Sequence, residues 1–122
     1  MPYPKAPAVL IVEDERLIRM LAADAFSEAG FLVFEAEHAA AALLILADAA
    51  DIHLLFTDVN MPGVMNGIDL AEQVTSATPE LLIIITSALP TQRPIDHLSA
   101  AFVPKPYDLQ DVCRTAKALL AA

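Results

Sequence analysis

The residues of this sequence that could do chemistry stand at the ends of apolar segments. Glu13 and Asp14 follow the run 8–12, Asp58 follows 52–57, Ser87 follows 81–86 and Lys105 follows 101–104. Each run has the length of a buried strand, and in an open parallel α/β sheet the carboxyl ends of the strands share one edge, where ligands bind. Three carboxylates, a hydroxyl and an ammonium meeting at that edge would form a site for a divalent cation and a phosphoryl group.

The adjacent acids Glu13 and Asp14 have two interpretations. They could simply begin a helix, because negative charge is favourable near the amide-rich end. They could also bind Mg²⁺, which takes one or two carboxylates and keeps several waters. Asp58 favours the second interpretation. It ends an apolar strand, where burial and repulsion from two other acids would need a cation to balance them.

Lys105 and two neighbouring hydroxyls complete the candidate site. A lone lysine is usually solvated, but the bond from Lys105 to Pro106 can be cis at modest cost, and a cis bond here would aim the ammonium at the carboxylates. Thr86 and Ser87 compete for the hydroxyl position. Only one of them can face Asp58 from a regular strand, because successive side chains point to opposite faces.

Apolar runs alternate with Ala-rich helical segments, which predicts a parallel sheet with right-handed crossovers and helices on both faces. We expect strands over 8–12, 31–36, 52–57, 81–86 and 101–104, and helices over 15–29, 39–49, 68–78 and 107–120. Pro90 and Pro94 interrupt the stretch 90–100, so we expect one short helix there at most. The fold class is therefore α/β, a doubly wound five-stranded parallel sheet whose fourth helix is short or irregular.

Composition limits the class of protein. A chain of 122 residues, 57% apolar and 19% charged, predicts one folded domain over 1–122, in which 1–7 form a flexible N-terminal segment. The net charge of −9, with seven basic residues, argues against nucleic-acid binding. The single Cys113 cannot form an internal disulfide. Without a membrane-length apolar segment or a signal-peptide pattern, we expect a cytoplasmic domain that does not bind membranes.

These segments, taken in order, resemble the receiver domain of two-component response regulators over essentially the whole chain. The matching residues are 12–15, 58–62, Gly67, 87–88 and 102–107. The resemblance implies a flavodoxin-like receiver fold and phosphorelay signalling. The domain would accept a phosphoryl group, with Mg²⁺ as cofactor, from a phosphohistidine of a histidine kinase or a histidine phosphotransfer protein.

The resemblance also implies a role for each polar residue. Asp58 corresponds to the phosphoacceptor and to one metal ligand, and Asp14 to a direct Mg²⁺ ligand. Glu13 would act on the metal through a bound water, and the backbone carbonyl of Asn60 would be a further ligand. Lys105 resembles the lysine that pairs with the phosphoryl group.

Two further residues correspond to the family's conformational switch. Ser87 resembles the hydroxyl that senses the phosphoryl group, and Phe102 falls at the aromatic switch position, three residues before the lysine. The loop 61–67 is one residue longer than the family's usual form. With that insertion Ser87 aligns at the sensing position, and Thr86 is the less favoured alternative.

Several alternatives stay open at this point. A receiver is not a conventional enzyme, although it catalyses its own phosphorylation and slow dephosphorylation. The chain could be a stand-alone regulator or part of a larger regulator or hybrid kinase. It could also form a homodimer. A receiver-like interaction module that is not phosphorylated is the alternative function. A Mg²⁺-dependent phosphohydrolase is disfavoured, since Asn60 stands where that class has a second acid. Ile18 could contact the kinase or simply pack in the core.

Overall fold

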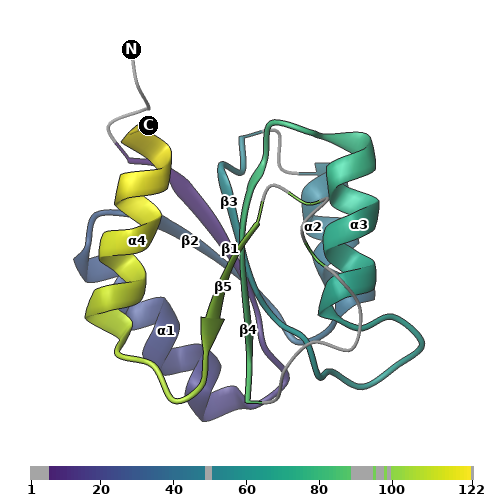
Figure 1. The fold of residues 1–122 in the computed structure, drawn as a ribbon, viewed down its shortest axis with the longest axis horizontal. Helices are drawn as coiled ribbons and strands as arrows, with labels where there is room; N and C mark the ends of the chain where they lie inside the picture. Colours follow the sequence, from purple (N-terminus) through teal and green to yellow (C-terminus); the bar gives the residue numbers. More distant parts are fainter. Residues whose placement is uncertain (1–5, 49–50, 89–94, 96–97, 99, 122) are drawn as a thin grey trace.

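Five parallel strands form a single sheet in the order β2-β1-β3-β4-β5 (Figure 1). The computed structural model describes residues 6–48, 51–88, 95, 98 and 100–121. The strands are β1 (Ala8–Val12), β2 (Leu32–Ala36), β3 (Leu54–Asp58), β4 (Leu82–Ser87) and β5 (Ala100–Pro104). This arrangement confirms the predicted five-stranded parallel sheet of the α/β class.

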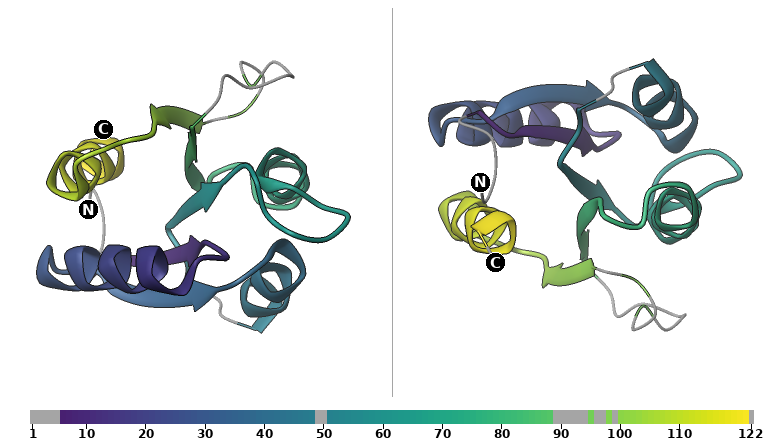
Figure 2. Two further views of the ribbon diagram at one scale, coloured as in Figure 1. Left: turned by 90° about the horizontal axis from the view of Figure 1, so that it is seen from below. Right: turned by 90° about the horizontal axis from the view of Figure 1, so that it is seen from above.

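Helices cover both faces of the sheet. They are α1 (Arg16–Glu28), α2 (Ala39–Asp48), α3 (Gly67–Ala77) and α4 (Leu109–Ala121). α1 and α4 lie on one face, and α2 and α3 lie on the other (Figures 1 and 2). The short helix expected within 90–100 falls mostly outside the described residues. No helix in the described part of the chain is both long and apolar enough to cross a membrane.

The central strands are apolar throughout because both of their faces are covered. All five residues of β1 and of β3 are buried. Their side chains alternate between two core clusters: Leu10 and Val12 belong to the cluster under α2 and α3, whereas Val9 and Ile11 belong to the cluster under α1 and α4. This continuous burial is typical of parallel sheets with helices on both sides.

The ends of several elements differ from the sequence-based boundaries for identifiable reasons. β3 extends through Asp58, because Asp58 still pairs with Thr86 of β4. α3 begins at Gly67, since the Asn66 side chain accepts from the backbone amides of Ile68 and Asp69 and caps the helix. α4 begins two residues later than expected, and Asp108 Oδ1 accepts from the backbone N–H of Gln110 at 2.7 Å in its first turn.

The register aligns the carboxyl ends of the strands at one edge. Val12 of β1 lies opposite Thr57 of β3, and Ser87 of β4 lies opposite Pro104 of β5. The residues that follow these strands therefore emerge side by side, as the predicted site requires.

Candidate functional site

Three carboxylates meet at the carboxyl edge of the sheet. Glu13 directly follows β1, Asp58 is the last residue of β3, and Asp14 begins the connection to α1. One ligand oxygen from each lies within 4.8 Å of the other two. Glu13 and Asp58 are buried, whereas Asp14 is exposed. The expected acidic cluster is thus present, with two of its carboxylates buried and the third facing solvent.

Lys105 supplies positive charge to this cluster. Its Nζ lies 3.1 Å from Asp58 Oδ2 and 3.6 Å from Glu13 Oε1. The backbone N–H of Lys105 donates to the carbonyl of Ser87 at 2.9 Å, which ties the residue to the end of β4. The Lys105–Pro106 bond is cis, the isomer considered from the sequence.

Burial and the neighbouring charges shift the pKa values of two groups at the site. Burial raises the pKa of Glu13 above its ordinary value of 4.5, and the negative charge of Asp58 and a hydrogen bond with Asp14 raise it further; the amide of Glu15 and the charge of Lys105 oppose the shift. Burial lowers the pKa of Lys105, but its hydrogen bond and charge attraction to Asp58 outweigh that effect and raise it overall. The Lys105 ammonium is therefore paired with two of the three carboxylates, Asp58 and Glu13.

This donor set fits a divalent metal ion. Carboxylate oxygens are hard ligands of the kind that Mg²⁺ binds, and Asp14 and Asp58 would supply the one or two direct carboxylates that it takes if Glu13 acts through a water. The exposed Asp14 leaves one side open for water ligands. Burial is the largest cause of the raised pKa of Glu13, and the negative charge of Asp58 adds to it. The role of the Asn60 carbonyl as a further ligand stays a prediction.

The two candidate hydroxyls are both buried at the end of β4. Thr86 lies opposite Asp58 in the register, and its Oγ1 has no hydrogen-bond partner among the described residues. Ser87 follows the alternation of Ile83 and Ile85, whose side chains belong to the cluster under α2 and α3. The register thus places Thr86 opposite Asp58, whereas the alternation along β4 places Ser87 on the face of the α2 and α3 cluster. The choice between the two hydroxyls stays a prediction.

Phe102 lies in the edge strand β5, opposite Ile85 of β4. It therefore shares a sheet face with Ser87, which lies two residues beyond Ile85 on β4. Phe102 is 37% exposed, so part of its ring faces solvent. Its ring is thus placed where an inward rotation could bury more apolar surface.

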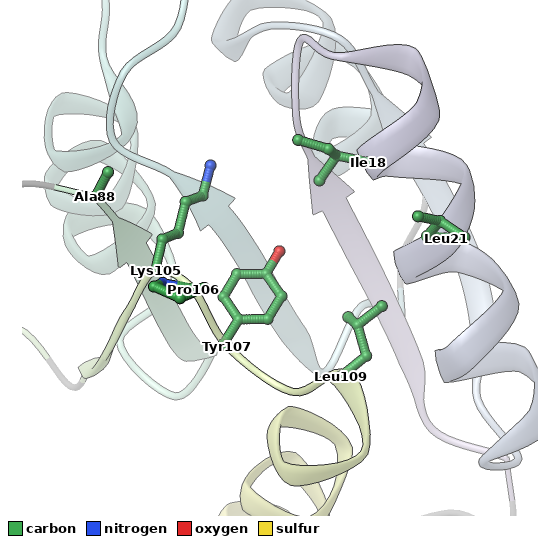
Figure 3. A pocket seen from close by; sticks show the side chains of 7 residues that line it. All are labelled: Ile18, Leu21, Ala88, Lys105, Pro106, Tyr107 and Leu109. Atoms are coloured by element: carbon green, nitrogen blue, oxygen red, sulfur yellow. The ribbon is translucent and has the colours of Figure 1, made fainter.

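An apolar groove of about 490 Å³ opens beside the carboxylates, between α1 and the segment that leads into α4 (Figure 3). Its lining residues are Ile18, Leu21, Ala88, Lys105, Pro106, Tyr107 and Leu109. The ring of Tyr107 packs edge-on against Phe56 of the core, with centroids 5.9 Å apart. Ile18 thus lies at the surface of this groove, which favours a contact role over simple core packing.

Two residues at the site were not assigned a function from the sequence. Arg19 of α1 donates from Nη1 to the backbone carbonyl of Glu13 at 2.8 Å. Gly67, part of the motif, lies so close to the backbone of Asp58 that it has no room for a side chain. In the sequence, Arg19 is indicated only by its proximity to the acidic pair along the chain. Gly67 is indicated only by its position at the start of a helix.

Comparison with known proteins agrees with this geometry. Residues 9–117 match the family described as the response regulator receiver domain. The chain therefore belongs to that family and is a receiver domain of two-component signal transduction, whose members partner with histidine kinases.

Individual relatives extend the comparison. Sensor kinase CckA of Brucella abortus (strain 2308) is 31% identical over 117 residues, which cover 92% of this chain and 12% of that protein. Aerobic respiration control protein ArcA of Escherichia coli (strain K12) is 31% identical over 123 residues, which cover 96% of this chain and 50% of that protein. The chain therefore spans half or less of the length of these curated relatives.

Solved structures agree as well. The receiver domain of the hybrid histidine kinase CckA is similar with a TM-score of 0.78 and 30% identity, over 93% of this chain and 98% of that one. A response regulator receiver protein from Sinorhizobium medicae WSM419 is similar with a TM-score of 0.85 over 97% of each chain. Its identity of 22% shows the fold alone.

Proposed function

We propose that this receiver accepts a phosphoryl group on Asp58 from a phosphohistidine of a histidine kinase or a histidine phosphotransfer protein, and that phosphorylation changes its binding to partners. The observation that carries this proposal is the distance of 3.1 Å between Lys105 Nζ and Asp58 Oδ2, beside two further carboxylates. An ammonium held at the nucleophilic carboxylate can pair with oxygens of the incoming phosphoryl group.

The reaction needs positioning and charge more than it needs acid–base chemistry. A carboxylate oxygen of Asp58 attacks phosphorus, the P–N bond breaks with its electron pair returning to the imidazole, and the P–O bond of an acyl phosphate forms. Lys105 balances charge on the phosphoryl oxygens. Asp14, Asp58, the Asn60 carbonyl and, through a water, Glu13 would hold Mg²⁺, which when bound supplies further positive charge. Later attack of water on phosphorus releases phosphate and restores the Asp58 carboxylate.

Phosphorylation would then be sensed by Ser87 and Phe102. The acyl phosphate adds negative charge and acceptor oxygens at Asp58. The Ser87 hydroxyl moves to donate to one of them, and the exposed Phe102 ring turns toward the space vacated on the same face of the sheet. Thr86 is the competing sensor, because its buried hydroxyl has no partner among the described residues.

The phosphohistidine donor docks on the apolar groove beside Lys105. Ile18 and Leu21 of α1 line one wall, and Tyr107 and Leu109 line the other (Figure 3). A helix that carries the phosphohistidine could place apolar side chains in this groove and its imidazole over Asp58. We expect the reaction to take place in the cytoplasm, where receiver domains generally act.

Intact mass after incubation with a small phosphodonor and Mg²⁺ tests the proposal. We expect one phosphoryl addition in the wild-type chain and none in Asp58→Asn. Asp24→Asn removes an exposed carboxylate on α1 and is the matched control, which should gain the phosphoryl group like the wild type. Absence of any addition with several donors would favour the interaction module instead.

A further inference from the structure

Arg19 of α1 contacts the acidic cluster without being one of its ligands. Its side chain is only 14% exposed. Nη1 donates to the backbone carbonyl of Glu13 at 2.8 Å, and Nε lies 3.4 Å from Glu35 Oε1 on β2. The guanidinium therefore links the helix, the connection after β1 and the edge strand.

The carbonyl that Arg19 binds lies in the peptide between the two adjacent acidic residues. The C=O of Glu13 and the N–H of Asp14 belong to one planar peptide group, and the Cα atoms of both residues lie in the same plane. A hydrogen bond to that carbonyl oxygen therefore restrains the two acidic residues together. The guanidinium restrains this carbonyl more strongly than a neutral donor would, because it is charged and rigid.

The other described contacts of Glu13 are not made to an atom of this peptide group. Its backbone N–H donates to the Ala36 carbonyl of β2 at 3.1 Å, which fixes the preceding peptide. Its Oε2 accepts from the Glu15 amide at 3.0 Å, which fixes the side chain. Among the described contacts, only the bond from Arg19 is made directly to an atom of the peptide between Glu13 and Asp14.

We propose that Arg19 is a positioning residue for the metal site: by holding the peptide between Glu13 and Asp14, it keeps their carboxylates at the separation from Asp58 that a divalent cation needs. The inference rests on the proposed binding of Mg²⁺. Groups that orient metal ligands from behind commonly change metal affinity by 10–100-fold when removed. Glu35 is half-exposed, so its ion pair with Arg19 contributes less than the bond to the carbonyl.

Titration calorimetry with Mg²⁺ on the whole chain tests this inference. We expect Arg19→Ala to weaken Mg²⁺ binding about tenfold or more. Glu35→Gln should weaken it only slightly. Arg16→Ala removes the same charge from an exposed position on the same helix and should bind Mg²⁺ like the wild type. If Arg19→Ala does not fold, Arg19→Met keeps the aliphatic stem without a donor and should show the same loss.

A second readout separates positioning from general destabilisation. In phosphorylation by a small phosphodonor, the Mg²⁺ concentration at half-maximal rate should rise by the same factor, while the rate at saturating Mg²⁺ stays within about twofold, because Asp58 and Lys105 are untouched. Unchanged Mg²⁺ affinity in the Arg19 variants, or a lower maximal rate with unchanged half-saturation, would overturn the inference. A wild-type chain that binds no Mg²⁺ would instead refute the proposed function.

Discussion

Gly67 at the start of α3 lies directly against the backbone of Asp58. A Cβ at this glycine would overlap the Asp58 carbonyl oxygen and stand 2.8 Å from its carbonyl carbon. The N–H of Gly67 also donates to the Val59 carbonyl at 2.9 Å. The first turn of α3 is thus joined to the end of β3, and the close approach needs a residue without a side chain.

Gly67→Ala should therefore displace the phosphoacceptor backbone as well as destabilise the fold. We expect a loss of about 3 kcal/mol in the free energy of unfolding, as for other overpacked sites, and a strongly reduced rate of phosphorylation at Asp58. Denaturant unfolding and intact mass measure the two effects. Gly63→Ala, in the loop before α3, is the control: Gly63 has a φ of +103° but no atom near its missing side chain. It should lose about 1–2 kcal/mol from backbone strain and still be phosphorylated.

The sequence predicts the edge where the site forms, because the chain topology leaves little choice. Once apolar strands alternate with helices, parallel connections bring every strand's carboxyl end to one side. That rule brings Glu13, Asp14, Asp58 and Lys105 to a common edge of the sheet. Their chemical roles remain predictions.

Other features depend on distances that a linear pattern does not contain. The acceptor of Arg19 is a backbone carbonyl, which no side-chain pattern reveals. The close approach of Gly67 to Asp58 depends on how α3 packs. The choice between Thr86 and Ser87 changes with a shift of one residue at the end of a strand, and β3 shows such a shift by extending through Asp58.

Lys105→Met should destabilise the protein most when no divalent cation is present. The change removes the ammonium that lies near two buried carboxylates. We expect the free energy of unfolding in EDTA to fall by about 2 kcal/mol, somewhat less than for a fully buried pair. Added Mg²⁺ should recover part of this loss, because it binds only the folded state. Lys117→Met, at an exposed position on α4, should change little in either buffer. An equal loss with and without Mg²⁺ would contradict this explanation.

Cys113 of α4 gives a pH dependence that is separate from the site. Burial raises the pKa of its thiol above the ordinary value of 9.0, and the charge of Lys117 offsets the shift only in part. Because the folded state holds the proton more tightly, the contribution of the neutral thiol is present below pH 9 and is lost as the pH rises through the folded-state pKa.

Comparison with Cys113→Ala isolates this effect. The wild-type chain should lose stability relative to the variant as the pH rises above 9, measured as the difference in unfolding free energy. Alkylation of the thiol at pH 8 should also be far slower in the native protein than in the denatured one. A difference between the two chains that stays constant with pH would show that the thiol does not titrate as described.

Phe102 should move when a phosphoryl group is bound. Fluorine NMR of protein labelled with fluorophenylalanine reports on five rings, and Phe102→Leu assigns the relevant signal. With beryllofluoride and Mg²⁺ we expect this signal to shift and its solvent exposure to fall. Ser87→Ala should prevent the shift and Thr86→Ala should preserve it; the reverse result would assign sensing to Thr86. A Phe102 signal that is identical in both states would exclude the proposed switch.

Leu21→Arg should separate docking of the donor from the chemistry at Asp58. Leu21 is 52% exposed on α1 and lines the groove beside Lys105. A charged side chain there would need to be desolvated when an apolar partner binds. Phosphotransfer from purified, autophosphorylated histidine kinases should therefore slow by about tenfold, whereas phosphorylation by a small phosphodonor should not change. Leu44→Arg places the same charge on α2, at a residue that is 73% exposed on the other face of the sheet, and should leave both rates at their wild-type values. If Leu21→Arg slowed both reactions equally, the effect would lie in the site itself. If it slowed neither, the donor would bind elsewhere.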